Sequence, residues 1–197
     1  MNLKMNLNRN YWENRYQKNE TGWDTGIITQ PLKTYFDQLT NKNLKILIPG
    51  GGNAYEFEYL IQKGFKNTHV LDFAETPIEN IKKRLPQVPY NQIIYEDFFS
   101  HKDNYDLIIE QTFFCALPPM ARKEYATKIN SLLNPQGKIA GLLFDFPLTE
   151  QGPPFGGSKE EYKLLFSPQF TIKTLEIAYN SIKPRQGKEL FFIFTKK

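Results

Sequence analysis

Acidic side chains, glycines and phenyl rings stand at the ends of four apolar segments that we expect to be strands. Glycine carries no side chain, so a ligand can approach the backbone closely there. A carboxylate accepts hydrogen bonds from hydroxyl or amino groups, and a phenyl ring packs on a flat base. One such feature is usually a capping or solvated residue, but four in register favour a ligand site. The residues concerned are Gly50, Gly51, Gly52, Asp72, Phe73, Asp97, Phe98 and Glu110.

These residue types suit a nucleoside that carries no phosphate. Asp72 stands where a carboxylate can accept hydrogen bonds from both ribose hydroxyls. Asp97 stands where a carboxylate can hold an adenine amino group, with the ring of Phe98 against the base. Tyr55 occupies the place of the third glycine of a dinucleotide fingerprint, and the Gly-Lys-Ser/Thr of a triphosphate loop is absent. S-adenosylmethionine (SAM) fits, because its cationic sulfonium suits acids and aromatic faces.

Composition excludes several other classes of protein. The only cysteine is Cys115 and the histidines are His69 and His101, which excludes a disulfide framework and argues against a metal centre. The net charge of +4 is small and dispersed, so we expect no nucleic-acid partner. No apolar run reaches the roughly 20 residues of a membrane span, so we expect no membrane partner. The first residues are polar and unlike a signal peptide, which makes the cytoplasm the expected location.

Apolar segments of strand length alternate with amphipathic segments of helical length, which is typical of an α/β protein. The last two predicted strands are joined by the turn 183–187, which can only form a hairpin. We therefore predict an α/β fold: a doubly wound, Rossmann-like, seven-stranded sheet, mostly parallel, with a C-terminal antiparallel hairpin and helices on both faces. Thr76 and Pro77 are expected to cap and begin one of the helices. The predicted strands are 44–49, 69–73, 93–95, 105–109, 138–146, 170–180 and 188–195.

Several longer motifs carry a family resemblance. They are Gly22-Trp23-Asp24-Thr25-Gly26, the run from Ile48 to Glu56, Asp97-Phe98-Phe99, the run from Phe113 to Leu117, and Gly152-Pro153-Pro154-Phe155. From Trp12 to its end the chain resembles the class I SAM-dependent methyltransferases. Within them it is similar to the thiopurine S-methyltransferase family, especially its thiol and halide methyltransferase branch.

The resemblance implies roles for particular residues. The glycine loop, Asp72, Phe73, Asp97, Phe98 and Glu110 would bind SAM, whose product is S-adenosylhomocysteine. Trp12, Tyr16 and Trp23 would cover it, within an N-terminal helical lid segment (1–40) that precedes the methyltransferase domain (41–197) of a single-domain protein. A core or subunit-packing patch is the alternative interpretation of these three aromatic residues.

An acceptor pocket is expected beside the cofactor. Ordinary core packing is the alternative for its phenylalanines, and a solvated turn residue is the alternative for its arginine. Glu110 or Tyr95 could assist a harder acceptor as a base, and no other catalytic residue is assigned. Gln111 stands where thiopurine-methylating members carry an Arg, so thiopurine turnover does not follow from the resemblance. The pocket residues are Phe113, Phe114, Pro154, Phe155 and Arg185.

The expected activity is methyl transfer from SAM to a small soft nucleophile such as a thiol, sulfide, thiopurine-like compound or halide. A thiol with a pKa of about 8.5 is partly ionised at neutral pH and needs little base catalysis. An oxygen, nitrogen or metalloid acceptor such as tellurite is an alternative, and so is a non-catalytic SAM-binding module. We expect a monomer or a weak homodimer, with no metal.

Overall fold

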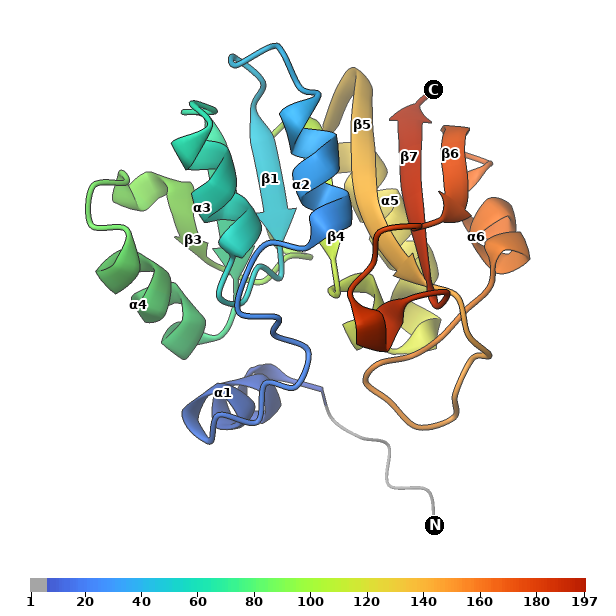
Figure 1. The fold of residues 1–197 in the computed structure, drawn as a ribbon, viewed down its shortest axis with the longest axis horizontal. Helices are drawn as coiled ribbons and strands as arrows, with labels where there is room; N and C mark the ends of the chain where they lie inside the picture. The colour runs from blue at the N-terminus through green and yellow to red at the C-terminus, as the bar shows by residue number, and fades with distance from the viewer. Residues whose placement is uncertain (1–6) are drawn as a thin grey trace.

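The computed structural model describes residues 7–197, and its central feature is a seven-stranded sheet in the order β3-β2-β1-β4-β5-β7-β6 (Figure 1). The strands β1 to β5 are parallel, and β7 runs antiparallel to both of its neighbours, β5 and β6. The predicted α/β fold with a C-terminal hairpin is therefore confirmed. The strands are β1 (Ile46–Pro49), β2 (Thr68–Asp72), β3 (Ile93–Tyr95), β4 (Tyr105–Gln111), β5 (Leu133–Phe144), β6 (Phe170–Ile177) and β7 (Glu189–Lys196).

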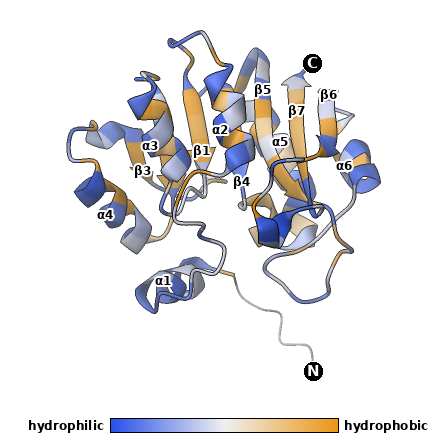
Figure 2. Ribbon diagram, in the orientation of Figure 1, coloured by the Kyte–Doolittle hydropathy of each residue, from blue (hydrophilic) through white to orange (hydrophobic). Residues whose placement is uncertain are grey.

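Helices cover both faces of the sheet, because successive side chains of each strand point to opposite faces. Ile46 and Ile48 of β1 pack in one buried cluster with α2, α3 and α4, whereas Leu47 packs in a second cluster with α5 and α6. Figure 2 shows the hydrophobic residues along strands such as β1 and β7, and hydrophilic residues on the outer turns of α4 and α6. The helices are α1 (Arg9–Gln17), α2 (Gln30–Asp37), α3 (Tyr55–Gln62), α4 (Glu75–Arg84), α5 (Arg122–Leu132) and α6 (Lys159–Phe166).

The N-terminal segment divides into two parts. Helix α1 lies beyond the sheet, at the end to which the arrowheads of the parallel strands point (Figure 1). Helix α2 instead belongs to the core, because Leu32 and Phe36 are buried against the sheet. The part of the predicted lid segment 1–40 that can cover a ligand is thus limited to the residues before α2, and residues 1–6 lie outside the described residues.

Several predicted boundaries were wrong; strand β6, for example, ends at Ile177 rather than at residue 180, and β5 ends at Phe144 rather than at residue 146. Strand β5 begins at Leu133 rather than at residue 138, because Leu133 already pairs with Tyr105 of β4. Helix α4 begins at Glu75, and Ala74, not Thr76, occupies its N-cap position without a side-chain hydrogen bond. Within residues 7–197, none of the helices is long and apolar enough to cross a membrane.

Candidate functional site

A cavity of about 630 Å³ lies at the carboxyl ends of the parallel strands. Its wall is built from the loops after β1, β2, β3 and β4 and from the lid segment around α1. From β1 the chain first adds β2 and β3 on one side and then β4 on the other, so the strand order reverses here. In open α/β sheets this reversal is where ligands bind, and the volume is typical of small-molecule sites. The predicted residues on its wall are Trp12, Tyr16, Trp23, Gly50, Gly51, Gly52, Asp72, Phe73, Asp97, Phe98, Phe113, Pro154 and Arg185.

The glycine loop forms the floor of the cavity between β1 and α3. Gly52 has a φ of +52°, a conformation that side chains rarely adopt, and a Cβ there would lie 2.6 Å from Oη of Tyr16. Its backbone N–H donates to Oδ2 of Asp72 at 2.9 Å. The N–H of Gly52 is thus bonded to Asp72, and the hydroxyl of Tyr16 from the lid lies directly against this glycine.

Asp72 ends β2 with its carboxylate buried beside the loop. Oδ1 accepts a hydrogen bond from the backbone N–H of Ala74 at 2.9 Å, in addition to the bond from Gly52. Burial raises the pKa of Asp72 to about 6. A carboxylate has about four acceptor positions, so these bonds leave capacity for the hydroxyl groups of a ligand.

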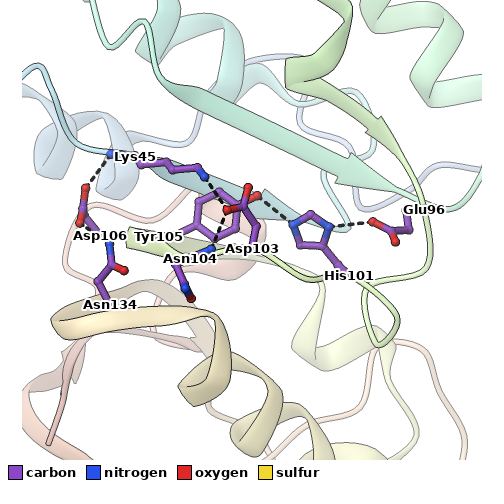
Figure 3. A network of polar contacts seen from close by, with 8 residues as sticks. All are labelled: Lys45, Glu96, His101, Asp103, Asn104, Tyr105, Asp106 and Asn134. Atoms are coloured by element: carbon purple, nitrogen blue, oxygen red, sulfur yellow. Dashed lines mark hydrogen bonds and ion pairs between the residues drawn. The ribbon is translucent and has the colours of Figure 1, made fainter.

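The segment after β3 is held rigidly in place. Oδ1 of Asp97 accepts the N–H of Phe99 at 2.7 Å, which closes a tight turn. The buried ring of His101 joins Glu96 at 2.7 Å to the hydroxyl of Tyr105 at 2.8 Å (Figure 3). These bonds tie both ends of the turn that presents Asp97 to the cavity.

Aromatic rings form two walls of the cavity. Phe98 lies edge-on to Phe113, with ring centroids 5.2 Å apart. On the lid, Trp23 lies edge-on to Trp12 at 5.3 Å and to Tyr16 at 5.7 Å. Burial and the nearby charge of Asp72 raise the pKa of Tyr16 well above its usual value, so its hydroxyl stays protonated. The lid thus offers aromatic faces and one hydroxyl donor.

Arg185 reaches the cavity from the turn before β7. It is 8% exposed, so it is not a solvated turn residue. Nη2 donates to the carbonyl of Trp23 at 2.6 Å, and Nη1 donates to buried Glu189 at 3.4 Å. The guanidinium therefore brings positive charge to the wall and connects the hairpin to the lid.

Three predicted site residues do not line the cavity. Glu110 is 1% exposed, and its carboxylate accepts the N–H groups of Phe113 and Phe114 and the hydroxyl of Tyr125. Phe114 is buried against Tyr125, and Phe155 is buried beside Gly152. Because Glu110 is occupied in holding the turn after β4, its predicted contact with the cofactor and its role as a base are corrected.

Other residues of the cavity wall were not among the predicted site residues. Glu56 is 6% exposed, and burial raises its pKa to about 7. Its position in the first turn after the glycine loop was the available signal. Oε1 of Gln111 is buried without a partner among residues 7–197, and Thr112 has a φ of +57°. Cys115 is buried, which raises the pKa of its thiol, and its carbonyl accepts the N–H of Phe155 at 2.7 Å.

Replacing Glu110 by Gln is expected to flatten the dependence of stability on pH. Burial raises the pKa of Glu110 from 4.5 to about 7, so the folded state holds a proton that the unfolded state releases. The free energy of unfolding of the wild type therefore falls as pH rises from 4.5 to 7, by about 3 kcal/mol from this group. Denaturant unfolding between pH 5 and pH 8 measures the slope. An identical slope in a folded Glu110→Gln variant contradicts the prediction.

Nothing within residues 7–197 gathers three or more His, Cys, Asp or Glu side chains in a way that could hold a metal ion. The groups that face the cavity are instead hydrogen-bonding side chains and aromatic rings. They fit SAM: Asp72 and the glycine loop suit its nucleoside, and the aromatic walls suit its sulfonium.

Comparison with known proteins gives a consistent result. The model of the family described as thiopurine S-methyltransferase (TPMT) matches residues 7–195. A probable thiol methyltransferase 2 of Arabidopsis thaliana is 30% identical over 187 residues, covering 90% of this chain and 81% of that protein. A thiopurine S-methyltransferase of Vibrio vulnificus (strain YJ016) is 26% identical over 197 residues, covering 91% and 90%.

A solved structure shares the fold at lower sequence identity. It is the 1,6-didemethyltoxoflavin-N1-methyltransferase of Burkholderia thailandensis with bound 1,6-didemethyltoxoflavin and S-adenosylhomocysteine. The TM-score is 0.75 at 15% identity, and the match covers 97% of this chain and 88% of that one. With the family model matched along nearly its whole length, this chain belongs to the thiopurine S-methyltransferase family.

Proposed function

We propose that the chain transfers a methyl group from SAM to a small soft nucleophile, with a thiol or hydrosulfide as the preferred acceptor. The observation that carries the proposal is one cavity whose wall combines two unlike sets of groups. One set is Asp72 and the glycine loop, and the other is the guanidinium of Arg185 with aromatic and proline side chains. We assign the nucleoside to the first set, called the first end, and a small anion to the second set, called the second end.

Residues of the first end hold and orient the cofactor. Asp72 would accept hydrogen bonds from the ribose hydroxyls, Asp97 would accept one from the adenine amino group, and Phe98 would pack on the base. When bound, SAM supplies an electrophilic methyl group on a sulfonium. Trp12, Tyr16 and Trp23 cover this region and exclude water, which favours in-line transfer to a nucleophile aligned behind the methyl group.

Residues of the second end prepare the acceptor. The positive charge of Arg185 favours the thiolate over the thiol, because an opposite charge nearby lowers the pKa of a thiol. Pro153 and Pro154 line the same region, and the loop that carries them is tied to the turn after β4 by the bond from Phe155 to Cys115. A thiolate formed here needs no further base.

A harder acceptor is the second candidate, and Glu56 is the observation that favours it. A buried carboxyl on the cavity wall with a pKa of about 7 can accept a proton from an oxygen or nitrogen nucleophile at neutral pH. Glu56→Gln at saturating SAM separates the two candidates. Unchanged transfer to thiols supports the soft nucleophile, whereas loss of transfer to an oxygen or nitrogen acceptor supports the harder one.

An acceptor panel tests the proposed function. Purified protein with SAM is offered hydrosulfide, a small thiol, an aromatic thiol, a thiopurine, iodide, tellurite and a small phenol, and the methylated products are identified by mass spectrometry. We expect hydrosulfide or a small thiol to give the highest kcat/KM, and the thiopurine to react poorly because Gln111 lines the cavity. Preference for the phenol contradicts the proposal.

Three further expectations from the sequence stay predictions. They are a monomer or weak homodimer, the division of the chain at residue 40, and a cytoplasmic location.

A further inference from the structure

One carboxylate of the lid caps the neighbouring helix α4. Oε2 of Glu13, in α1, accepts the backbone N–H groups of Glu75 at 2.8 Å and Thr76 at 3.1 Å. Oε1 accepts the hydroxyl of Thr76. Ala74 at the N-cap of α4 has no side-chain acceptor, so Glu13 supplies from the lid the cap that α4 lacks in its own sequence.

The start of α4 is also held by a carboxylate of the cavity wall. Oδ1 of Asp72 accepts the N–H of Ala74 at 2.9 Å, directly before the two N–H groups that Glu13 accepts. Three successive backbone donors are thus divided between a carboxylate of the cavity wall and a carboxylate of the lid. The position of the lid and the site of Asp72 share one rigid element, the first turn of α4.

Besides these bonds, helix α1 is held by the packing of Trp12 and Tyr16 against Trp23. None of its residues belongs to the fully buried core. Trp12 and Tyr16 stand four residues apart, so they share the face that lines the cavity, while Glu13 projects from the adjacent face toward α4. The bonds of Glu13 therefore fix the rotation of α1 that turns these two rings toward the cavity. Arg9 over the ring of Tyr95, at 5.0 Å, adds a weaker contact.

We propose that Glu13 is a positioning residue that fastens the aromatic lid over the cavity and so sets how long the ligand stays bound. This inference rests on the proposed function, since it takes that ligand to be SAM or S-adenosylhomocysteine. Hydrogen bonds to a charged group are the stronger ones in proteins. Their loss in Glu13→Ala is expected to speed dissociation of S-adenosylhomocysteine about tenfold or more.

Tryptophan fluorescence reports the lid selectively, because the chain has two tryptophans and both, Trp12 and Trp23, belong to it. The experiment measures dissociation of S-adenosylhomocysteine by stopped-flow fluorescence in the wild type, Glu13→Ala, Glu13→Gln and Thr76→Val. Glu20→Gln is the matched control, since it removes an exposed lid carboxylate whose ion-pair partner, Arg15, lies at 4.0 Å. Circular dichroism and thermal unfolding of each variant check the fold.

The expected result is a graded effect on the dissociation rate. Glu13→Ala is fastest, Glu13→Gln and Thr76→Val are intermediate, and Glu20→Gln matches the wild type, while the melting temperatures stay close because α1 contributes no residue to the fully buried core. A rate for Glu13→Ala equal to that of Glu20→Gln overturns the inference. If the wild type binds no ligand, the proposed function fails. Acrylamide quenching of tryptophan fluorescence in the ligand-free proteins then tests whether Glu13 fastens the lid. Quenching rises in Glu13→Ala only if the lid is loosened.

Discussion

Asp72→Ala is expected to weaken SAM binding more than about 100-fold while the protein stays folded. The variant loses the bonds to both ribose hydroxyls, each worth about 1.5–3 kcal/mol to a charged acceptor. It also frees the N–H of Gly52, which Asp72 accepts at 2.9 Å, and so loosens the glycine loop. The fold tolerates the change, because burial raises the pKa of Asp72 to about 6 and its charge is therefore unfavourable in the folded state near neutral pH.

Asp72→Asn is the matched control, since it keeps the shape of the side chain and one acceptor oxygen. Titration calorimetry should give an intermediate affinity. In the wild type, SAM affinity should also fall as pH drops below about 6, because the carboxylate takes up a proton and loses acceptor capacity. This fall in affinity at low pH should be absent in Asp72→Asn. Unchanged SAM binding in a folded Asp72→Ala variant would remove Asp72 from the site.

Arg185→Met is expected to abolish transfer to anionic acceptors and to destabilise the protein by about 3 kcal/mol or more. Glu189 is 2% exposed, and without the guanidinium its buried charge has lost its ion-pair partner. The carbonyl of Trp23 also loses its donor. The loss of activity has a separate cause, because the cavity wall loses the charge that favours a thiolate.

Arg185→Met combined with Glu189→Gln separates these two effects. The second change removes the unpaired charge, so the free energy of unfolding should recover, while kcat/KM for hydrosulfide should stay at least about 100-fold below the wild type. Calorimetric SAM binding checks that the cofactor end is intact. Wild-type transfer to hydrosulfide in the stable double variant would show that Arg185 has only a structural role.

The sheet and the position of Asp72 and the glycine loop on the cavity wall could be predicted from the sequence, because their signals are local. All four residues of β1 are buried, so the strand reads as an apolar run, and the glycines that follow mark its end. The position of Asp72 beside the glycine loop could be predicted too, because parallel strands place their carboxyl ends at one edge of the sheet. The short turn before β7 identified the hairpin.

The errors concern side chains whose partners lie far along the chain. Glu110 stands at a strand end as Asp72 does, but the hydroxyl of Tyr125 on α5 draws its carboxylate into the core. Thr76 precedes Pro77 as a helix N-cap residue would, yet its hydroxyl donates a hydrogen bond to Glu13, 63 residues away. Burial of Glu56 likewise depends on how α3 packs in the finished fold. Only tertiary structure settles such choices.

The most direct test of the central claim follows a methyl group from SAM to sulfur. The purified protein is incubated with SAM deuterated in its methyl group and with hydrosulfide, and the volatile product is analysed by mass spectrometry beside folded Asp72→Ala. We predict deuterated methanethiol from the wild type, with a rate at least about 100-fold lower from the variant at limiting SAM. A folded protein that binds SAM and yields no methylated product from hydrosulfide or any small thiol would contradict the claim.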